Sequence, residues 1–211
     1  MKILITAGAT WIKIDAIRIL TNRFTGKTGL YLAGELKKKG HRVTLLINPH
    51  CTGKIKGLEA IYYHYFEEFK EKVAKILKNE HYDVIIHMAA VSDYKLKNTP
   101  QGKIPSGSKS LLLRFVPTEK IIKRIRMLAK KSLIVQFKLE PKRKGIVEDA
   151  YRSLKENKSD FVVANALEDL TLGYKGFLIN RDKEIIPLKS KKELLDILDR
   201  AIRGKLKLRC I

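Results

Sequence analysis

The sequence predicts an α/β protein with a Rossmann-like, three-layer fold, in which helices cover both faces of a mainly parallel sheet. Apolar runs rich in β-branched residues alternate along the chain with helical patterns, as parallel strands joined by crossover helices do. The chain has 211 residues, of which 45% are hydrophobic, so it can bury the core of one ordinary domain. The sequence contains no internal repeat and no low-complexity linker, so residues 1–211 are expected to form a single domain.

Each predicted strand is a short apolar run, and each predicted helix carries apolar residues at helical spacing. Gly40 suits the end of the first helix, and Thr118 suits the N-cap of the third. The expected strands, in chain order, are 2–8, 42–47, 60–65, 83–90, 132–139 and 160–166. The expected helices are about 27–39, 67–78, 118–130 and 146–157.

Two segments depart from this alternation. Residues 91–117 contain a turn-rich stretch followed by LLLRFV, which predicts a flap with an extra strand in a small added sheet. Near the end of the chain, over about 174–205, GFLINRD and EIIPL predict a hairpin that turns at Arg181 and Asp182. A last helix is expected over about 190–203.

The composition excludes some classes of protein. Forty-four Lys and Arg against 22 Asp and Glu give a net charge of +22, which attracts polyanions, acidic membranes or phosphorylated small molecules. The chain lacks an aromatic-interleaved basic stripe, so nucleic acid is not an expected partner. Cys51 and Cys210 lack metal-ligand spacing and predict neither a disulfide framework nor a zinc site. The N-terminal apolar run is too short for a signal peptide or a membrane span, so a cytoplasmic location without membrane contact is expected.

Ligands of open parallel sheets bind beyond the carboxyl ends of the strands, so a site is expected after Gly8, Ala90, Leu139 and Ala166. Polar residues follow all four positions. Residues 22–29 open the first helix with hydroxyls, small side chains and free backbone N–H groups. Such a helix start is a ready anion site, but it equally suits a capped helix without a ligand.

The sequence matches parts of two known enzyme motifs, the P-loop and the Tyr-x-x-x-Lys pair of short-chain dehydrogenases. The tripeptide GKT at 26–28 copies the end of a P-loop, but Thr21 stands where that motif needs glycine, which excludes it. Tyr151 and Lys155 have the spacing found in short-chain dehydrogenases, so an NAD(P)-dependent oxidoreductase is an alternative function. The glycine fingerprint that admits a dinucleotide is absent after the first strand, and a solvated pair is the simpler interpretation of the two residues.

Other residues with chemical potential have ordinary explanations. The five histidines include no pair at the i, i+4 spacing of a helical metal site. His87, inside an apolar strand, is interpreted as a packed residue with a backbone hydrogen bond rather than as a general base. Trp11 fits either a ligand anchor or a loop staple.

Seven blocks in the same order carry a family resemblance. ITAGAT, with ID at 14–15 and IR at 17–18, resembles the pattern ITAGGT, ID and VR, and ILTNRFTGKTG resembles ISNxSSGxxG. AAVSDY matches AAVADY, GKI at 102–104 matches the start of a lysine-bearing flap, and VQFKLE resembles VGFxAE. SDFVVAN matches LDLIVAN, and GF at 176–177 followed by Asn180 matches the last block of the pattern. From Ile3 to about Leu198 the sequence therefore resembles phosphopantothenoylcysteine synthetase, a ligase of coenzyme A biosynthesis.

The resemblance implies a reaction in two steps. The carboxylate of 4′-phosphopantothenate attacks the α-phosphate of CTP or ATP, which forms an acyl-nucleotide and releases pyrophosphate. The amine of cysteine then attacks the acyl carbon and expels the nucleoside monophosphate. This chemistry needs charge neutralisation more than a protein nucleophile, and Mg²⁺ is expected with the triphosphate. A degenerate relative that binds nucleotide without turnover is a further alternative.

Carried over residue by residue, the resemblance implies two catalytic side chains. Asn22 would bind the acyl intermediate and support its conversion to the amide, because an uncharged amide serves an oxyanion and an amine without repelling phosphates. Lys103 would assist acyl-nucleotide formation, with its ammonium meeting the triphosphate. The implied nucleotide site comprises Gly8, Met88, Ala89, Ala90, Asp93, Lys103, Pro117, Thr118 and Phe137, and the implied substrate site comprises Asn22, Thr25, Gly26 and Asn165. The resemblance leaves the ligands of the metal unassigned.

Four positions depart from the family pattern. Ser153 stands where a lysine usually grips a phosphate, although Arg152 and Lys155 are close enough to substitute. The three residues that add bulk near a phosphate or base are Ala9, Phe24 and Gln136. These positions bear on activity and nucleotide choice.

The resemblance also implies protein partners. A flavin-dependent decarboxylase is often fused ahead of such synthetases and is not found in this sequence, so a separate decarboxylase is expected. Family members dimerise through an added sheet, and LLLRFV with the late hairpin would supply that surface, since apolar strands are otherwise exposed edges. A homodimer is therefore expected.

Overall fold

One mixed sheet of eight strands forms the centre of the protein. The computed structural model describes residues 1–50, 57–171 and 174–204, and in it the strand order is β12-β11-β10-β9-β6-β1-β4-β5. All neighbours from β5 across to β10 run parallel, whereas β11 and β12 run antiparallel. The predicted fold class is confirmed. Cys51 and Cys210, on which two predictions were made, lie outside the described residues.

The predicted strands, helices and late hairpin are all present, with bounds shifted by a few residues. The strands of the main sheet are β1 (Lys2–Ala7), β4 (Arg42–Ile47), β5 (Glu59–Tyr62), β6 (Val84–His87), β9 (Leu133–Glu140), β10 (Phe161–Ala166), β11 (Gly176–Asn180) and β12 (Ile185–Leu188). The helices are α1 (Lys27–Lys38), α2 (Phe66–Asn79), α3 (Ile121–Leu128), α4 (Ile146–Asn157) and α5 (Lys191–Ile202), with a short 3₁₀ helix η1 (Glu168–Thr171). No helix among the described residues is both long and apolar enough to cross a membrane.

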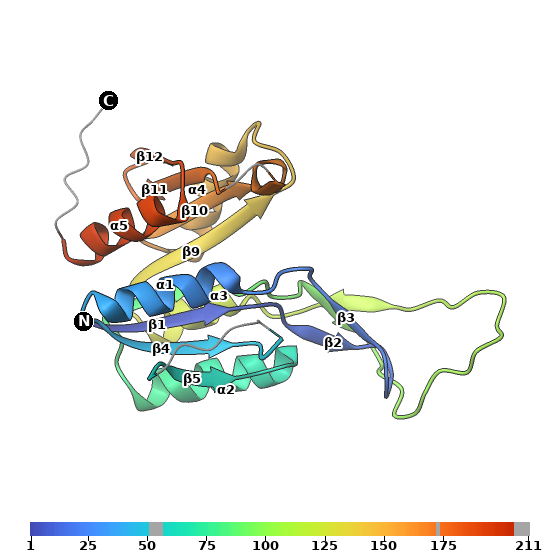
Figure 1. The fold of residues 1–211 in the computed structure, drawn as a ribbon. Helices are drawn as coiled ribbons and strands as arrows, with labels where there is room; N and C mark the ends of the chain where they lie inside the picture. The colour runs from blue at the N-terminus through green and yellow to red at the C-terminus, as the bar shows by residue number, and fades with distance from the viewer. Residues whose placement is uncertain (51–56, 172–173, 205–211) are drawn as a thin grey trace.

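Helices cover both faces of the sheet because side chains alternate along each strand (Figure 1). Along β1, Ile3 and Ile5 pack with α1 and α5, whereas Leu4 packs with α2 and α3 on the opposite face. α4 covers β10 and β11 on the α3 side, where it buries Leu154. The three-layer arrangement predicted from the sequence is therefore observed.

The ends of two helices test the predicted caps. Gly40 has φ +86° and donates its N–H to the carbonyl of Lys37, while the N–H of His41 reaches Leu36, so the predicted stop is a Schellman motif. Thr118 is not the N-cap of α3, because the helix begins three residues later at Ile121. Its hydroxyl instead donates to the carbonyl of Ser92 at 2.6 Å, which ties it to the neighbouring loop.

Two small antiparallel sheets project from the carboxyl ends of the main sheet (Figure 1). β2 (Trp11–Lys13) pairs with β3 (Ile19–Thr21), and β7 (Tyr94–Leu96) pairs with β8 (Phe115–Pro117). We call these two pairs, with the β2–β3 turn at 14–18 and the connecting residues 97–114, the arm. The β2–β3 hairpin was not predicted, because only the short triplets IKI at 12–14 and IRI at 17–19 alternate in polarity as strands do.

The predicted extra strand LLLRFV is only partly correct. The strand begins at Phe115, because β7 offers three residues for pairing and residues 111–114 have no partner strand. β11 and β12 form the predicted late hairpin, and β11 pairs with β10, so the hairpin extends the main sheet. The small sheets come from segments that follow β1 and β6.

Candidate functional site

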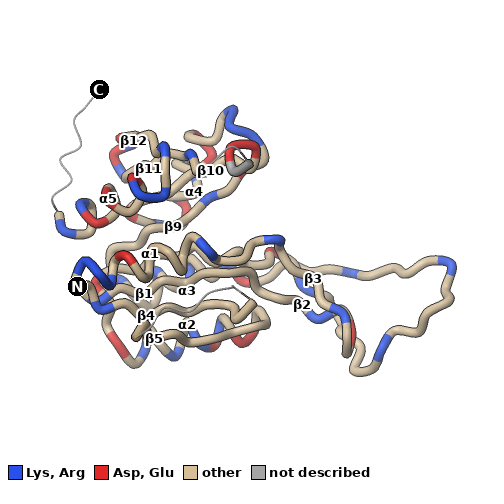
Figure 2. The backbone as a smooth tube through the Cα atoms, in the orientation of Figure 1, with Lys and Arg blue, Asp and Glu red and all other residues tan. Residues whose placement is uncertain are grey.

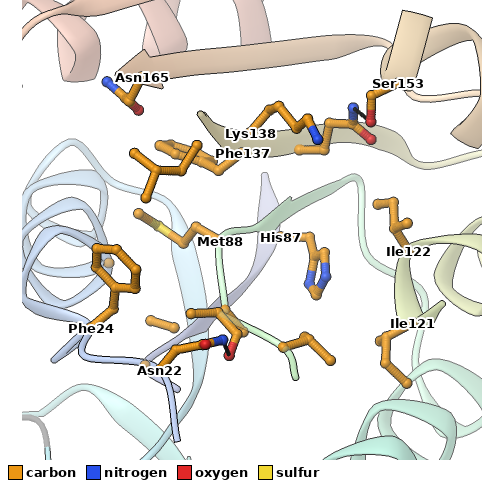
Figure 3. Close-up of a pocket in the computed structure, with 18 of the residues that line it drawn as sticks. Asn22, Phe24, His87, Met88, Ile121, Ile122, Phe137, Lys138, Ser153 and Asn165 are labelled. Atoms are coloured by element: carbon orange, nitrogen blue, oxygen red, sulfur yellow. Dashed lines mark hydrogen bonds between the residues drawn. The ribbon is translucent and has the colours of Figure 1, made fainter. Parts of the chain in front are cut away.

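A cleft opens at the carboxyl ends of the parallel strands. The chain proceeds from β1 to β4 on one side and returns through β6 on the other, so β1 and β6 form the switch point where such sheets bind ligands. The cleft has a volume of about 1170 Å³, and its floor comes from the ends of β1, β6 and β9. Its walls are the starts of α1 and α3 and one side of α4 (Figure 3).

Most residues of the predicted site line this one cleft. The lining includes both predicted substrate residues and predicted nucleotide residues, namely Gly8, Asn22, Thr25, Gly26, Met88, Ala89, Ala90, Asp93, Thr118, Phe137 and Asn165. Lys103 and Pro117 do not line it. Pro117 ends β8 beside Thr118, whereas Lys103 lies on the arm.

The floor of the cleft depends on close contact between β1 and the start of α1. A Cβ on Gly26 would lie 2.7 Å from the backbone nitrogen of Gly8, and a Cβ on Gly29 would lie 2.4 Å from the Cβ of Ala7. Both Gly8 and Gly26 have positive φ, at +81° and +78°. Glycines therefore let the helix start approach the strand end directly.

Two helices direct their N-termini into the cleft without a side-chain cap. The N-cap of α1 is Gly26 and that of α3 is Lys120, and neither side chain bonds the first turn. Neither first turn contains an acidic residue, and residues of both first turns line the cleft. The free N–H groups and the positive ends of the two helix dipoles favour an anion. Of the two interpretations of residues 22–29, this arrangement favours the anion site.

Charged side chains add to this preference. Asp93 pairs with Lys120 at 2.6 Å, Glu140 with Lys138 at 2.9 Å, and Asp149 with Arg152 at 3.3 Å. Among the described residues, three cations of the cleft lining pair with no carboxylate: Lys27, Lys123 and Lys191. Sequence reasoning missed these lysines, which are three of the many Lys and Arg spread over the body and the arm (Figure 2). Only their location beside a helix start distinguishes them.

Asn22 extends from the end of β3 into the cleft (Figure 3). Its Nδ2 donates to the carbonyl of Ala90 at 3.2 Å, which links the β3 segment to the loop after β6. One N–H and the Oδ1 of the amide remain for a ligand. The amide is thus held in place by main chain and is still able to donate and accept.

Asn165, in contrast, uses both its Nδ2 and its Oδ1 for hydrogen bonds within the protein. Its Nδ2 donates to the carbonyl of Lys175 at 2.7 Å, and its Oδ1 accepts from the Tyr174 hydroxyl at 3.3 Å. Burial raises the pKa of the Tyr174 phenol, so it stays protonated and remains a donor. Asn165 therefore braces the connection from β10 to β11 at the edge of the cleft.

His87 lines the floor of the cleft at the end of β6 (Figure 3). Its Nδ1 lies 2.8 Å from the Thr6 hydroxyl, so the predicted backbone hydrogen bond is wrong and the partner is a side chain. Burial lowers the pKa of His87 to about 4, so the ring is neutral at pH 7. Phe69 stacks on it with ring centroids 6.2 Å apart. The residue is packed, as predicted.

Comparison with known proteins gives the family. A sequence profile described as the DNA/pantothenate metabolism flavoprotein C-terminal domain matches residues 1–203. The chain belongs to this family. The resemblance inferred from the seven motif blocks is thereby confirmed.

Similar proteins agree with this family assignment. A Thermococcus kodakarensis protein named coenzyme A biosynthesis bifunctional protein CoaBC is 35% identical over 201 residues, which cover 93% of this chain and 49% of that protein. The chain thus spans about half the length of the curated relatives that it matches.

Two solved structures share the fold. The DNA/pantothenate metabolism flavoprotein from Streptococcus pneumoniae has a TM-score of 0.87 and 23% identity, covering 98% of this chain and 100% of that one. A Cab2 mutant in complex with phosphopantothenate-cysteine has a TM-score of 0.79 and 20% identity, covering 96% of this chain and 85% of that one.

The departures from the family pattern occupy different places. Phe24 lines the cleft and is 38% exposed, whereas Ala9 is buried outside the lining. Gln136 lies at the cleft floor, where its amide bonds the hydroxyls of Ser153 at 3.2 Å and Ser159 at 3.0 Å. Gln136, Ser153 and Ser159 therefore form a partly buried polar network. Of the two cations near Ser153, Arg152 lines the cleft.

The remaining motifs take no part in the cleft. The Tyr151 hydroxyl donates to the carbonyl of Arg181 at 3.1 Å, and the Lys155 ammonium lies 5.8 Å from the centre of the Tyr151 ring. The dehydrogenase alternative is wrong, because this pair faces the β11–β12 turn. Trp11 packs against His50 and His64, with ring centroids 4.5 and 5.2 Å away, which makes it a loop staple.

Proposed function

We propose that the protein is a phosphopantothenate–cysteine ligase that works through an acyl-nucleotide formed from CTP or ATP. Family membership supports this, as does the name of the Thermococcus relative, which refers to coenzyme A biosynthesis. The Cab2 complex supports it further, because a protein of the same fold binds phosphopantothenate-cysteine. The observation that carries the proposal is the position of Asn22 between two uncapped helix N-termini at the switch point of the sheet.

The charge distribution of the cleft fits substrates that bring several phosphates together. Phosphopantothenate and a nucleoside triphosphate are both anions, and their approach must be neutralised before a carboxylate can attack the α-phosphate. The N-termini of α1 and α3 and the unpaired ammonium groups of Lys27, Lys123 and Lys191 would supply this neutralisation. In this arrangement the pyrophosphate leaves toward cationic groups.

Asn22 would act in the second step. Its amide keeps one N–H for the carbonyl oxygen of the acyl-nucleotide and its Oδ1 for the amine of cysteine. A carboxylate at this position would accept from the amine but would repel the phosphate of the leaving nucleotide. The hydrogen bond to Ala90 would keep the amide oriented while the amine attacks.

The nucleotide would lie along the loop after β6. The backbone of Met88, Ala89 and Ala90, the ring of Phe137 and the start of α3 line this side of the cleft. Main-chain groups would contact the base, and this fits either CTP or ATP. Mg²⁺ would arrive with the triphosphate, because the described residues contain no cluster of three or more side chains that could hold a metal ion.

We also propose a homodimer that forms through the arm. Apolar side chains of the arm stand in solvent, including Ile17 at 65%, Tyr94 at 58% and Leu112 at 97% exposure. A second copy that covers them would remove this apolar area from water. Lys103 is also on the arm. It would reach a triphosphate either in the cleft of its own protomer, after the arm moves over it, or in the cleft of the second copy.

A pyrophosphate-release assay tests the ligase. We expect release with phosphopantothenate and either CTP or ATP, and amide formation after cysteine is added. Asn22→Asp should leave pyrophosphate release intact and slow amide formation by about a hundredfold. Lys103→Gln should slow pyrophosphate release by a similar factor.

Two matched substitutions on the arm serve as controls. Asn98→Asp and Lys109→Gln make the same chemical changes at exposed positions outside the cleft lining, and both should behave like the parent. Absence of turnover with both nucleotides would overturn the proposed function. Parent-like rates in Asn22→Asp and Lys103→Gln would overturn the residue roles while leaving the family unaffected.

A further inference from the structure

The turn of the β2–β3 hairpin forms hydrogen bonds with residues 102–104 of the connection 97–114. The N–H of Ala16 donates to the carbonyl of Gly102 at 3.3 Å, and the N–H of Ile104 donates to the Asp15 carboxylate at 3.0 Å. The Arg18 guanidinium also donates to the carbonyl of Ile104 at 3.3 Å. In the part of the chain that the structure describes, residues 105–113 make no hydrogen bond to the rest of the protein. Residues 102–104 are therefore a fixed point within a long exposed connection.

The Asp15 carboxylate is the centre of this contact. Its side chain is 0% exposed although it lies on the arm. Oδ1 accepts from the N–H groups of Ile17 at 2.9 Å and Arg18 at 2.7 Å, which closes the hairpin turn. Oδ2 accepts from the Arg18 guanidinium and from Ile104. One oxygen thus forms the turn, and the other holds the connection.

A buried carboxylate is stable only when its oxygens are satisfied, and here four donors satisfy them. Burial alone would raise the pKa of Asp15, but the N–H groups of Ile17, Ile104 and Arg18 and the guanidinium outweigh it and hold the pKa well below its usual range. The carboxylate is therefore ionised at any pH at which a metabolic enzyme works.

We propose that Asp15 is a positioning residue for Lys103: its Oδ2 accepts from the Ile104 N–H directly after that lysine, and its Oδ1 closes the turn whose Ala16 N–H holds the Gly102 carbonyl directly before it. The inference rests on the proposed role of Lys103 in acyl-nucleotide formation. Without this contact, residues 97–114 would adopt many conformations and the Lys103 ammonium would occupy many positions. Bringing it to the triphosphate would then cost more conformational entropy.

The same hairpin also carries Asn22. β3 leads from the turn at Arg18 to Thr21, a span of roughly 10 Å for an extended chain, and Asn22 follows at the cleft. Asn22 is bonded to the main chain of Ala90 and Asp15 to the main chain of Ile104. The β2–β3 hairpin thus connects the two proposed catalytic residues: Asn22 follows its cleft end, and the segment that carries Lys103 is bonded to its turn.

The two oxygens of Asp15 allow a selective test. Asp15→Asn keeps Oδ1 for the turn but replaces Oδ2 with an amide nitrogen, which faces the donors of Ile104 and Arg18. It should release residues 102–104 without removing the turn. Asp160→Asn is the matched control, because the Oδ2 of Asp160 also accepts from a backbone N–H, that of Ile134 at 2.8 Å, and from the guanidinium of Arg126 at 2.6 Å. Asp160 lies at the amino ends of β9 and β10, away from the arm.

Limited digestion of the full chain with trypsin tests the physical contact. Cleavage after Lys103 should be slow in the parent, and cleavage after Lys109, in the unbonded part of the same connection, should be fast. Asp15→Asn should speed cleavage after Lys103 by about tenfold and leave cleavage after Lys109 unchanged. Asp160→Asn should alter neither rate. If Asp15→Asn does not fold, Asp15→Ser keeps one side-chain oxygen for the turn, removes the oxygen that accepts from the Ile104 N–H, and leaves the Lys103–Ile104 bond cleavable by trypsin.

Pyrophosphate release in the absence of cysteine tests the consequence for catalysis. Asp15→Asn should lower kcat by about tenfold and change the KM values for phosphopantothenate and nucleotide by less than about twofold. In the Lys103→Gln background, the same substitution should change the rate by less than about twofold, because a residue that acts through Lys103 has nothing left to position.

Each outcome decides a different point. Unchanged cleavage after Lys103 in Asp15→Asn, or an equal loss of rate with and without Lys103, overturns the inference. If Lys103→Gln alone releases pyrophosphate like the parent, the proposed role of Lys103 fails and the catalytic part of the inference fails with it. The digestion still decides whether Asp15 holds the connection.

Discussion

The floor of the cleft and the arm beside it are held in place by different forces. The floor consists of the carboxyl ends of strands. Within these strands, Ile5 of β1 and Ile86 of β6 are 0% exposed and pack between helices. The arm carries apolar side chains that remain in solvent, and its long connection is fixed by the contacts of Asp15 and its neighbours. Packing positions the first region, and a few hydrogen bonds position the second.

This difference predicts how each region responds to change. Groups in the cleft are positioned by many weak contacts, so removing one polar contact leaves their geometry intact, whereas damage to the packing unfolds the domain. Groups on the arm depend on single contacts, so one substitution displaces them without a loss of global stability.

The largest effect is expected from Phe69→Ala. Phe69 is 0% exposed, lies 4.5 Å from the Tyr63 ring and stacks on His87 beneath the cleft. Removing it should lower the free energy of unfolding by about 3–5 kcal/mol, measured by urea denaturation. A loss below about 1 kcal/mol would show that packing does not hold the floor of the cleft.

A smaller effect is expected from titration of His87. Its folded-state pKa is about 4, below the usual 6.5, so the unfolded chain binds a proton in this window and the folded chain does not. The stability contribution of the neutral ring is complete above pH 6.5 and is lost as the pH falls toward 4. Between pH 7.5 and 4.5 the loss should be about 2–3 kcal/mol.

Urea denaturation at the two pH values checks this, with His87→Gln lacking that part of the pH dependence. His81→Gln is the control, since the His81 side chain is 67% exposed. Equal pH dependence in the parent and His87→Gln would contradict the prediction.

Gly29→Ala should lower the free energy of unfolding by about 1–3 kcal/mol, because its Cβ overpacks the contact between α1 and β1. The new atom would lie 2.4 Å from the Ala7 Cβ. Gly102→Ala is the matched change on the arm, where nothing lies within 4 Å of the added Cβ. It should change stability by less than about 0.5 kcal/mol. Equal effects in thermal denaturation would remove the distinction between the two regions.

The smallest effect on stability is expected from Leu112→Ala. The side chain is 97% exposed, so its removal should change the free energy of unfolding by less than about 0.5 kcal/mol. The proposed homodimer should nevertheless dissociate at a lower concentration, as measured by light scattering over a dilution series. A parent protein that is monomeric at micromolar concentration would refute the dimer.

The sequence alone predicted the sheet, its helices and the location of the cleft. Alternating apolar runs specify which face of each strand is buried, and the carboxyl ends of parallel strands must meet at one edge, so Gly8, Ala90 and Leu139 could be expected to converge. Asn22 and Phe137 were expected there only from the family resemblance. Gly40 was also predictable, because the end of a helix in a left-handed conformation is a local property of the chain.

Only the tertiary structure revealed the hairpin after β1, the side-chain partner of His87 and the place of Lys103. Thr6 and His87 are 81 positions apart, and Asp15 and Ile104 are 89 positions apart. Neither pairing leaves a periodic signal in either segment. Burial patterns repeat along the chain and can be predicted from it, whereas a single polar contact between distant loops depends on where the packed core places those loops.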